Sequence, residues 1–279
     1  MVKTFIDLNQ HGFFSKRSVV TNLVPFVQNI TNTMESGRDT CAVYTDFSKA
    51  FDKVHHSTLL VKLGNFGVHG TLLRLFESYL TDRVQYVVVN GVRSTNVGVT
   101  SGVPQGSHLG PLLFSVFLND IGQCFANSQY SLYADDLKIS RAIDDINDYV
   151  LLQADLLNFA SYCICNRLFV NIDKCHCILF SKRSLNLQLK ADLYLNNVRL
   201  KSLSSVKDLG VTLDSKLLFD THVEITVQKA LKNLGYLLRV TKDFKNVKSL
   251  ITLFNSLVRP ILKHATTVCC VCIKNTFII

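Results

Sequence analysis

Apolar residues recur along this chain with two different spacings. Between Ser18 and Met34 they fall three or four positions apart, which predicts a helix, and Ser36-Gly37 supplies its stop. Elsewhere, short apolar runs bounded by turn residues predict strands. Helices and short strands together indicate a mixed α+β fold. Further helices are predicted over 57–63, 72–80, 112–118, 146–167, 221–240 and 244–258.

The dipeptide Asn90-Gly91 predicts a β-hairpin. It favours a tight primed turn, and the strand-like runs 84–89 and 92–99 flank it directly. Other short strands are predicted over 177–180, over 193–200 with a turn at Asn196-Asn197, and from there to Leu213.

Three acidic residues follow strand-like runs. The run 41–45 ends directly before Asp46. Two later runs, 130–133 and 137–140, are joined by a turn that contains Asp135-Asp136. The paired acids are therefore expected at the tip of a second hairpin.

Neighbouring aspartates in a tight turn repel each other and raise one another's pKa. A divalent cation removes this cost, because Mg²⁺ prefers oxygen ligands and is commonly held by one or two carboxylates together with phosphate oxygens. Two such ions about 3.5–4 Å apart can activate an attacking hydroxyl and stabilise a leaving group. The residues alone leave a second interpretation open, in which Asp46 caps the next helix and Asp135-Asp136 only form a turn.

The composition fits a folded protein outside the membrane. Of 279 residues, 48% are hydrophobic and 10% aromatic, which is enough for a substantial core. The longest apolar run, 110–121, is too short to span a bilayer, and Asp7 interrupts the start where a signal peptide would continue its apolar core. We therefore expect an intracellular protein, nuclear or cytoplasmic, with no signal peptide or transmembrane segment.

The positive charge is concentrated in the second half of the chain. Residues 1–140 hold 11 Lys and Arg against 10 Asp and Glu, whereas residues 141–279 hold 19 against 11, within a total of +9. Between Lys174 and Lys263 there are 16 basic and 6 acidic residues. Such an excess is typical of a region that grips phosphates, and equally of a solvated helix surface.

Nine cysteines, several of them inside apolar runs, favour a reducing compartment. Cys163 and Cys165, followed by Cys175 and Cys177 around His176, raise the hypothesis of a zinc-binding module. The ligand types suit zinc, but the usual spacing of two to four residues between paired cysteines is absent, so buried core thiols are the favoured interpretation.

Three blocks of sequence carry a resemblance to a known family. Together, and in this order, they resemble the motifs of reverse transcriptases of non-LTR retrotransposons, of the jockey-like kind. The resemblance extends from about residue 9 to about residue 262. The three blocks are 44–52 (YTDFSKAFD), 101–111 (SGVPQGSHLGP) and 133–136 (YADD), and two looser blocks are 10–13 (QHGF) and 207–214 (KDLGVTLD).

The resemblance implies a right-hand polymerase fold of the α+β class. It would have an antiparallel-sheet palm, a helical thumb and only part of the fingers, so an N-terminal truncation is expected. Residues 1–215 are expected to form the partial fingers and the palm, and residues 216–279 a helical thumb-like region.

The resemblance also implies which residues form the active site. Asp46, Asp135 and Asp136 match the catalytic and metal-binding carboxylates of the family, and the backbone carbonyl of Phe47 matches a further metal ligand. Lys174 matches a lysine that protonates the departing pyrophosphate as general acid. The expected substrate-binding residues are Phe51 as the gate that excludes a 2′-hydroxyl, Gln105 and Gly106 beside the incoming nucleotide, and Tyr133 and Ala134 near the primer end.

The implied function is RNA-directed DNA polymerisation, in which two Mg²⁺ ions, or alternatively Mn²⁺, promote transfer of a deoxynucleotide to a primer 3′-hydroxyl. The implied partners are an RNA template, a DNA primer and dNTPs, with no membrane; no oligomeric state is indicated. The alternative is a truncated, catalytically inactive relic of such an element that still binds nucleic acid.

Overall fold

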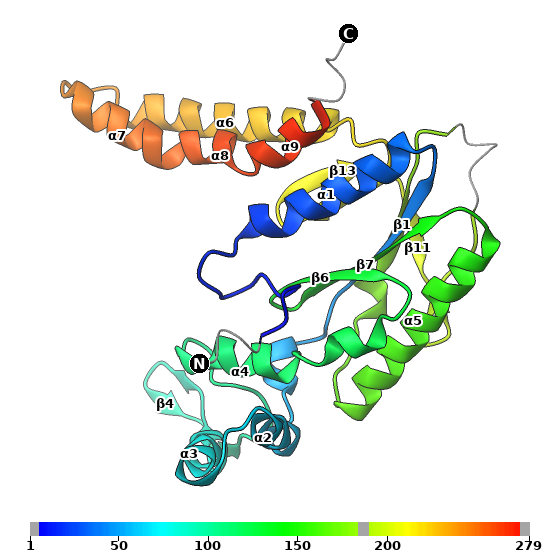
Figure 1. Ribbon diagram of the computed structural model, residues 1–279. Helices are drawn as coiled ribbons and strands as arrows, with labels where there is room; N and C mark the ends of the chain where they lie inside the picture. Colours follow the sequence, from blue (N-terminus) through cyan, green and yellow to red (C-terminus); the bar gives the residue numbers. More distant parts are fainter. Residues whose placement is uncertain (1–5, 184–189, 274–279) are drawn as a thin grey trace. The chain divides into compact units, whose positions relative to one another are not determined.

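The computed structural model describes residues 6–183 and 190–273, which form two compact units. The first unit comprises Met1–Ser18, Cys41–Cys177 and Leu189–Ser202. The second comprises Val19–Thr40, Ile178–Gln188 and Leu203–Ile279. The fold is of the α+β class, as the sequence predicts, with an antiparallel hairpin and helices in the first unit and a largely helical second unit (Figure 1).

The main sheet has five strands in the order β11-β8-β1-β7-β6. Six of the seven β1 residues are buried, among them the consecutive apolar residues Cys41, Ala42 and Val43, so both faces of the strand are covered. β6 and β7 pair antiparallel, with Tyr133 opposite Asp136 and Gln129 opposite Ser140, so the predicted second hairpin is confirmed. The strands are β1 (Asp39–Thr45), β6 (Gln129–Tyr133), β7 (Asp136–Ile143), β8 (His176–Phe180) and β11 (Lys201–Leu203).

Helix α5 (Ile146–Cys165) lies against β7 (Figure 1). It begins with a capping box, because the Asp145 side chain accepts hydrogen bonds from the Asn147 and Asp148 backbone and Asp148 reciprocates. Its buried residues recur three or four positions apart, so one face of the helix covers the sheet. Those buried residues are Tyr149, Leu152, Asp155, Leu156, Phe159, Ala160 and Cys163.

A buried lysine joins three helices of the first unit. Lys62 of α2 donates hydrogen bonds to the Phe117 carbonyl (2.7 Å), to Asp120 Oδ1 (2.7 Å) and to the Tyr162 hydroxyl (3.0 Å). Burial lowers the pKa of Lys62, and the bond to Asp120 opposes that shift. Because each of its donors has a partner, the ammonium holds α2, α4 and α5 together. Of these helices, α2 comprises His56–Asn65 and α4 comprises Leu109–Phe117; α3 (Gly70–Leu80) follows α2 and packs against it.

The predicted Asn90-Gly91 hairpin is confirmed as two short ladders. Val89 pairs with Val92, and further out Val84 pairs with Gly98. All four short strands are exposed. They are β2 (Val84–Gln85), β3 (Val88–Val89), β4 (Val92–Arg93) and β5 (Val97–Gly98).

The second unit is mainly helical. α1 (Val19–Glu35) is the predicted first helix, and it contacts α9 (Thr266–Ile273). α6 (Asp220–Val240) packs against α7 (Val247–Leu257) and α8 (Arg259–Lys263) through a small core of Ala230, Leu237 and Val258. α6 and α7 confirm two predicted helices. The short strands β12 (Ser205–Asp208) and β13 (Val211–Asp214) pair antiparallel in this unit, whereas β9 (Tyr194–Leu195) and β10 (Val198–Arg199) pair in the first.

Within residues 6–183 and 190–273, no helix has the length and apolar character needed to cross a bilayer.

Candidate active site

Asp46 follows β1, and its backbone is fixed by a neighbouring segment of the first unit. The Asn171 amide donates to the Asp46 carbonyl (2.8 Å), and the Ser48 amide donates to the Phe169 carbonyl (2.7 Å). Between them, Phe47 and Val170 form an antiparallel bridge. The Phe47 side chain is buried against the Phe159 ring. The strand end that carries Asp46 is therefore held on both sides of the carboxylate.

Asp135 and Asp136 lie at the tip of the β6–β7 hairpin, as predicted. Because Tyr133 pairs with Asp136, the turn itself consists of Ala134 and Asp135. Ala134 is buried and has a positive φ of 59°, a left-handed conformation that costs a residue with a Cβ free energy. Asp135 is half-buried and Asp136 is exposed.

A hydrogen bond joins the end of β1 to the start of β7. Thr45 Oγ1 donates to the Leu137 carbonyl at 3.3 Å, so Asp46 lies beside the hairpin tip. Burial raises the pKa of Asp135, and the negative charge of Asp46 raises it further. The structure thus brings two of the three predicted carboxylates into electrostatic contact.

The three carboxylates do not form a closed cage. Among the described residues, no three His, Cys, Asp or Glu side chains are grouped closely enough to hold a metal ion. The cation nearest to Asp46 is instead Lys174, whose Nζ lies 3.3 Å from Asp46 Oδ2. Lys174 ends the short 3₁₀ helix η4 (Ile172–Lys174), and most of its side chain is exposed. The two predicted catalytic residues Asp46 and Lys174 are therefore adjacent.

Phe51 lies in the 3₁₀ helix η2 (Ala50–Lys53), directly after the Asp46 strand end. Its ring stacks on Phe114 of α4, with centroids 4.2 Å apart and planes 23° apart. The Phe13 ring meets it edge-on, with centroids 6.0 Å apart. The predicted gate is held between two other aromatic rings.

Gln105 and Gly106 lie in the loop before α4. Gln105 Nε2 donates to Asp52 Oδ1 at 2.7 Å, which ties this loop to η2. Gly106 has a φ of 77°, and a Cβ built on it would meet no atom within 4 Å, so only the backbone conformation calls for glycine.

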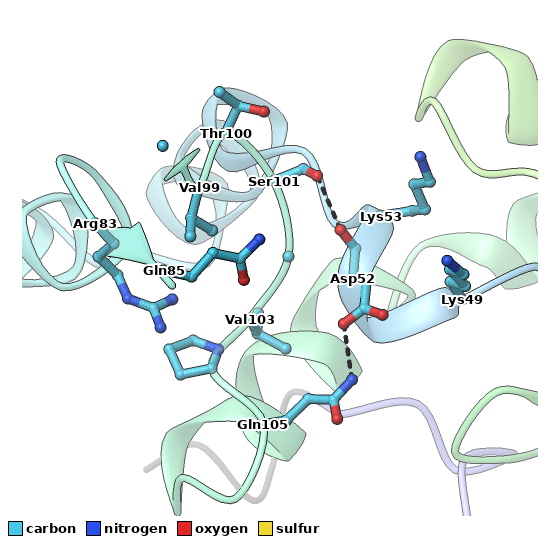
Figure 2. Close-up of a pocket in the computed structure, with 13 residues that line it drawn as sticks. Lys49, Asp52, Lys53, Arg83, Gln85, Val99, Thr100, Ser101, Val103 and Gln105 are labelled. Carbon is cyan, nitrogen blue, oxygen red and sulfur yellow. Dashed lines mark hydrogen bonds between the residues drawn. The ribbon is translucent and has the colours of Figure 1, made fainter. Parts of the chain in front are cut away.

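A polar cavity of about 560 Å³ lies beside Asp52 (Figure 2). Arg83 and Gln85 lie on one side of Asp52, and Lys49 and Lys53 on the other. Ser101 Oγ donates to the Asp52 carbonyl at 2.9 Å, which joins the loop that lines the cavity to η2. The sequence did not single out the three basic residues of this cavity as a group, because Arg83 lies outside the segment that contains Lys49 and Lys53 and no motif connects it to them.

The cysteines give no support to the zinc hypothesis. Cys163, Cys175 and Cys177 are buried, whereas Cys165 is exposed. Burial raises the pKa of the Cys163 thiol, and it raises that of Cys175 to about 11. Buried thiols with raised pKa values are poor thiolate ligands and fit the interpretation as core residues.

The N-terminal segment contributes two residues whose roles the sequence did not reveal. Gln10 is 2% exposed, and its side chain bonds both the amide and the carbonyl of Ala134. Gly12 lies so close to this turn that a built Cβ would be 2.4 Å from the Ala134 nitrogen. The two residues belong to the block 10–13, but the residue they both meet, Ala134, lies 124 positions beyond Gln10 in the chain.

An antiparallel hairpin whose tip carries paired aspartates, beside a strand end that carries a third, is the arrangement expected of the palm of a nucleic-acid polymerase. The comparison with protein families agrees: residues 1–238 match the family described as reverse transcriptase (RNA-dependent DNA polymerase). The chain belongs to this family, and its relatives place it with the reverse transcriptases of non-LTR retrotransposons.

Two curated relatives come from Drosophila melanogaster. The chain is 31% identical over 237 residues to the probable RNA-directed DNA polymerase from transposon BS, and the match covers 82% of this chain and 26% of the relative. It is 29% identical over 231 residues to the RNA-directed DNA polymerase from mobile element jockey, which covers 80% and 25%. The chain thus spans about a quarter of the length of these relatives.

Among solved structures, the chain is similar to telomerases of Candida tropicalis. The complex with a TWJ fragment of telomeric RNA has a TM-score of 0.55 and 12% identity, and the match covers 96% of this chain and 43% of that one. The apo telomerase has a TM-score of 0.52 and 8% identity, over 74% and 36%. These likenesses concern the fold alone, and they agree with the predicted right-hand polymerase architecture.

Proposed function

We propose that this chain is the RNA-directed DNA polymerase domain of a non-LTR retrotransposon, which extends a DNA primer with dNTPs on an RNA template. The observation that carries the proposal is that the strand end with Asp46 lies beside the hairpin tip with Asp135 and Asp136, in a chain of this family: β1 neighbours β7 in the sheet, and Thr45 bonds the Leu137 carbonyl at 3.3 Å. Two repelling carboxylates on adjacent strand ends have the electrostatics of a cation site.

Members of this family require a divalent metal, and we assign its ligands to Asp46, Asp135, Asp136 and the Phe47 carbonyl. All four donors are oxygens, which suits two Mg²⁺ ions, with Mn²⁺ as the alternative. Bound ions would supply activation of the primer hydroxyl and neutralisation of the leaving pyrophosphate. The Lys174 ammonium lies 3.3 Å from Asp46 Oδ2, and this attraction of a positive charge supports Asp46 as a ligand of a metal cation.

The chemical step joins the primer 3′-oxygen to the α-phosphorus of the nucleotide while the bond to the pyrophosphate oxygen breaks. Lys174 is proposed to donate a proton to that departing oxygen as general acid. Support comes from its position, because its Nζ is within 3.3 Å of a carboxylate of the same site and its side chain is free to reach solvent.

Nucleotide selection is assigned to Phe51, with Gln105 and Gly106 beside the base and sugar, and with Tyr133 and Ala134 near the primer end. The fixed ring of Phe51 between Phe13 and Phe114 supports a gate, since a rigid ring excludes a hydroxyl better than a mobile one. The adjacent cavity carries three basic side chains, which suits a phosphate-bearing ligand.

Residues 1–215 are proposed to act as partial fingers and palm, and residues 216–279 as a thumb-like region. The largely helical structure of residues 220–273, together with their excess of basic side chains, supports the second assignment. An intracellular location, nuclear or cytoplasmic, is part of the same proposal.

The test is extension of a DNA primer on an RNA template with Mg²⁺ and dNTPs, comparing the unmodified chain with Asp135→Asn. The variant keeps the side-chain volume but loses a metal-binding charge, so extension should fall at least about 100-fold. Extension by the unmodified chain that does not exceed that of the variant would overturn the polymerase activity. Retained binding of the template–primer in that case would favour the alternative, an inactive nucleic-acid-binding relic.

A further inference from the structure

The segment Gln10–Phe13 touches the proposed active site at two points. We propose that Gln10 positions the turn that carries Asp135, and that Phe13 positions the gate ring of Phe51. Neither residue is proposed to touch the reacting atoms. The inference rests on the proposed function, and it names the residues that set the geometry of that site.

Gln10 bonds both backbone polar groups of Ala134, the first residue of the turn. Its Oε1 accepts from the Ala134 amide at 2.9 Å, and its Nε2 donates to the Ala134 carbonyl at 3.1 Å. Its Oε1 also accepts from the Gly12 amide at 2.8 Å. Because the side chain is 2% exposed, water does not replace these bonds readily when they are lost. The Gln10 side-chain amide thus bonds the backbone of Ala134, directly before Asp135, as the backbone of a neighbouring strand would.

The turn needs this support because its sequence does not favour its shape. Ala134 has a φ of 59°, and in a two-residue turn with this sign glycine is the preferred first residue. A left-handed alanine persists only where its surroundings impose it. Gln10 provides such surroundings for both polar groups of Ala134.

The segment that carries Gln10 is itself anchored. It pairs with β6 as a short parallel strand, through bonds from the His11 amide to the Leu132 carbonyl (2.8 Å) and from the Leu132 amide to the Asn9 carbonyl (2.9 Å). Arg17 holds it from behind, donating to the carbonyl groups of Asp7 and Gln10. The backbone around Gln10 is therefore held by hydrogen bonds on both sides, and this fixes the position from which its side chain bonds the turn.

Phe13 connects the same segment to the gate. It adopts a φ of 65°, an uncommon conformation for a residue with a large side chain, and its ring contacts Phe51 edge-on. Phe13 is 55% exposed and so is not a core residue, but its ring contacts that of Phe51. The Phe51 ring contacts the rings of Phe13 and Phe114, so loss of Phe13 would leave it with the Phe114 contact and more freedom to move.

The first test compares Gln10→Ala with Gln153→Ala. Gln153 makes the same pair of bonds to the Tyr194 backbone, both at 2.8 Å, on a part of the first unit that carries none of the proposed site residues. Gln10→Ala is expected to weaken Mn²⁺ binding, followed by electron paramagnetic resonance, about 10-fold or more and to lower kcat, because residues that support metal ligands have effects of that size. The KM for template–primer should stay unchanged. Gln153→Ala should leave Mn²⁺ affinity and kcat as in the unmodified chain.

Equal Mn²⁺ affinity and equal kcat in the two variants would overturn the role of Gln10. If Gln10→Ala does not fold, Gln10→Glu replaces it, since it keeps the volume and the acceptor but loses the donor to Ala134. It should lose part of the Mn²⁺ affinity and of kcat, and full retention of both would equally overturn the role.

The second test compares Phe13→Ala with Leu8→Ala, a change in the same segment at a residue that is 81% exposed. Phe13→Ala is expected to lower the preference for dNTPs over rNTPs several-fold while leaving Mn²⁺ affinity unchanged, because the gate loosens and the turn does not. Leu8→Ala should change neither quantity. An unchanged preference in Phe13→Ala would overturn its role.

The Mn²⁺ titration separates this inference from the proposed activity. An unmodified chain that binds Mn²⁺ but extends no primer would overturn the activity, and the titration of Gln10→Ala would still decide the role of Gln10. An unmodified chain that binds no Mn²⁺ would overturn both.

Discussion

The first unit contains two hairpins with two-residue turns, and the two turns are held in opposite ways. In one, Asn90 and Gly91 lie between the paired residues Val89 and Val92, and both have positive φ values of 49° and 79°. Asparagine followed by glycine is the favoured sequence for such a turn, so its conformation is encoded locally. The strands on either side are exposed and contribute little burial.

In the other hairpin, Ala134 and Asp135 occupy the turn between Tyr133 and Asp136. Its first residue, Ala134, has a Cβ and a left-handed conformation, and the hydrogen bonds that hold it come from Gln10, 124 positions earlier in the chain. The comparison shows that the turn with proposed chemistry is shaped by distant contacts, whereas the turn without it is shaped by its own residues. The turn that carries Asp135 therefore keeps its shape with alanine at position 134, where glycine would adopt the left-handed conformation more easily.

Among the substitutions that test the comparison of the two turns, the largest effect is expected from Gly12→Ala. A Cβ there would lie 2.4 Å from the Ala134 nitrogen, so either the segment or the turn must move. We expect a loss of about 1–3 kcal/mol in the free energy of unfolding, and at least about a 10-fold loss of primer extension, because overpacking and small displacements of reacting groups have such costs. Urea denaturation and single-turnover extension measure the two quantities.

Gly64→Ala is the matched control. Gly64 lies in α2, and a Cβ built on it meets nothing within 4 Å. The free energy of unfolding of Gly64→Ala should rise by about 0.5–1 kcal/mol, because alanine is more favourable than glycine inside a helix, and primer extension should be unchanged. If Gly12→Ala behaved in the same way, distant contacts would not control the Ala134 turn.

A smaller effect, confined to the exposed hairpin, is expected from Gly91→Ala. A left-handed alanine should cost this hairpin about 1 kcal/mol, which makes its amide hydrogens exchange about fivefold faster between Val88 and Arg93. Primer extension should be unchanged. Loss of extension in this variant would show that the two hairpins are not independent.

The smallest effect is expected from Ala134→Gly. It relieves the left-handed strain but adds backbone freedom to the unfolded chain, so the free energy of unfolding should rise by less than about 1 kcal/mol. Urea denaturation provides the measurement. A clear loss of stability would mean that packing of the buried Ala134 methyl outweighs the backbone strain.

The sequence was sufficient wherever structure depends on neighbours along the chain. The apolar period of α1 and the strand runs around Asp46 and Asp135 predicted these elements, because one buried face leaves a periodic signal. α9 was not predicted, since its run of threonine, valine and cysteine has no helical period.

The sequence was insufficient where a side chain meets backbone from a distant segment. The bond from Gln10 to Ala134 leaves no periodic trace in the sequence. The same holds for the 3.3 Å ion pair of Lys174 with Asp46, which joins two segments predicted separately. The family motifs marked the residues concerned but not their partners.

The pairing of residues 9–11 with Leu132 has one more consequence. β6 is the last strand of its sheet, and an open strand edge is a template for pairing with another chain. By occupying the Leu132 amide and carbonyl, the N-terminal segment covers this edge from within the same molecule. A chain that begins after Phe13 would leave the edge bare, and we expect it to self-associate.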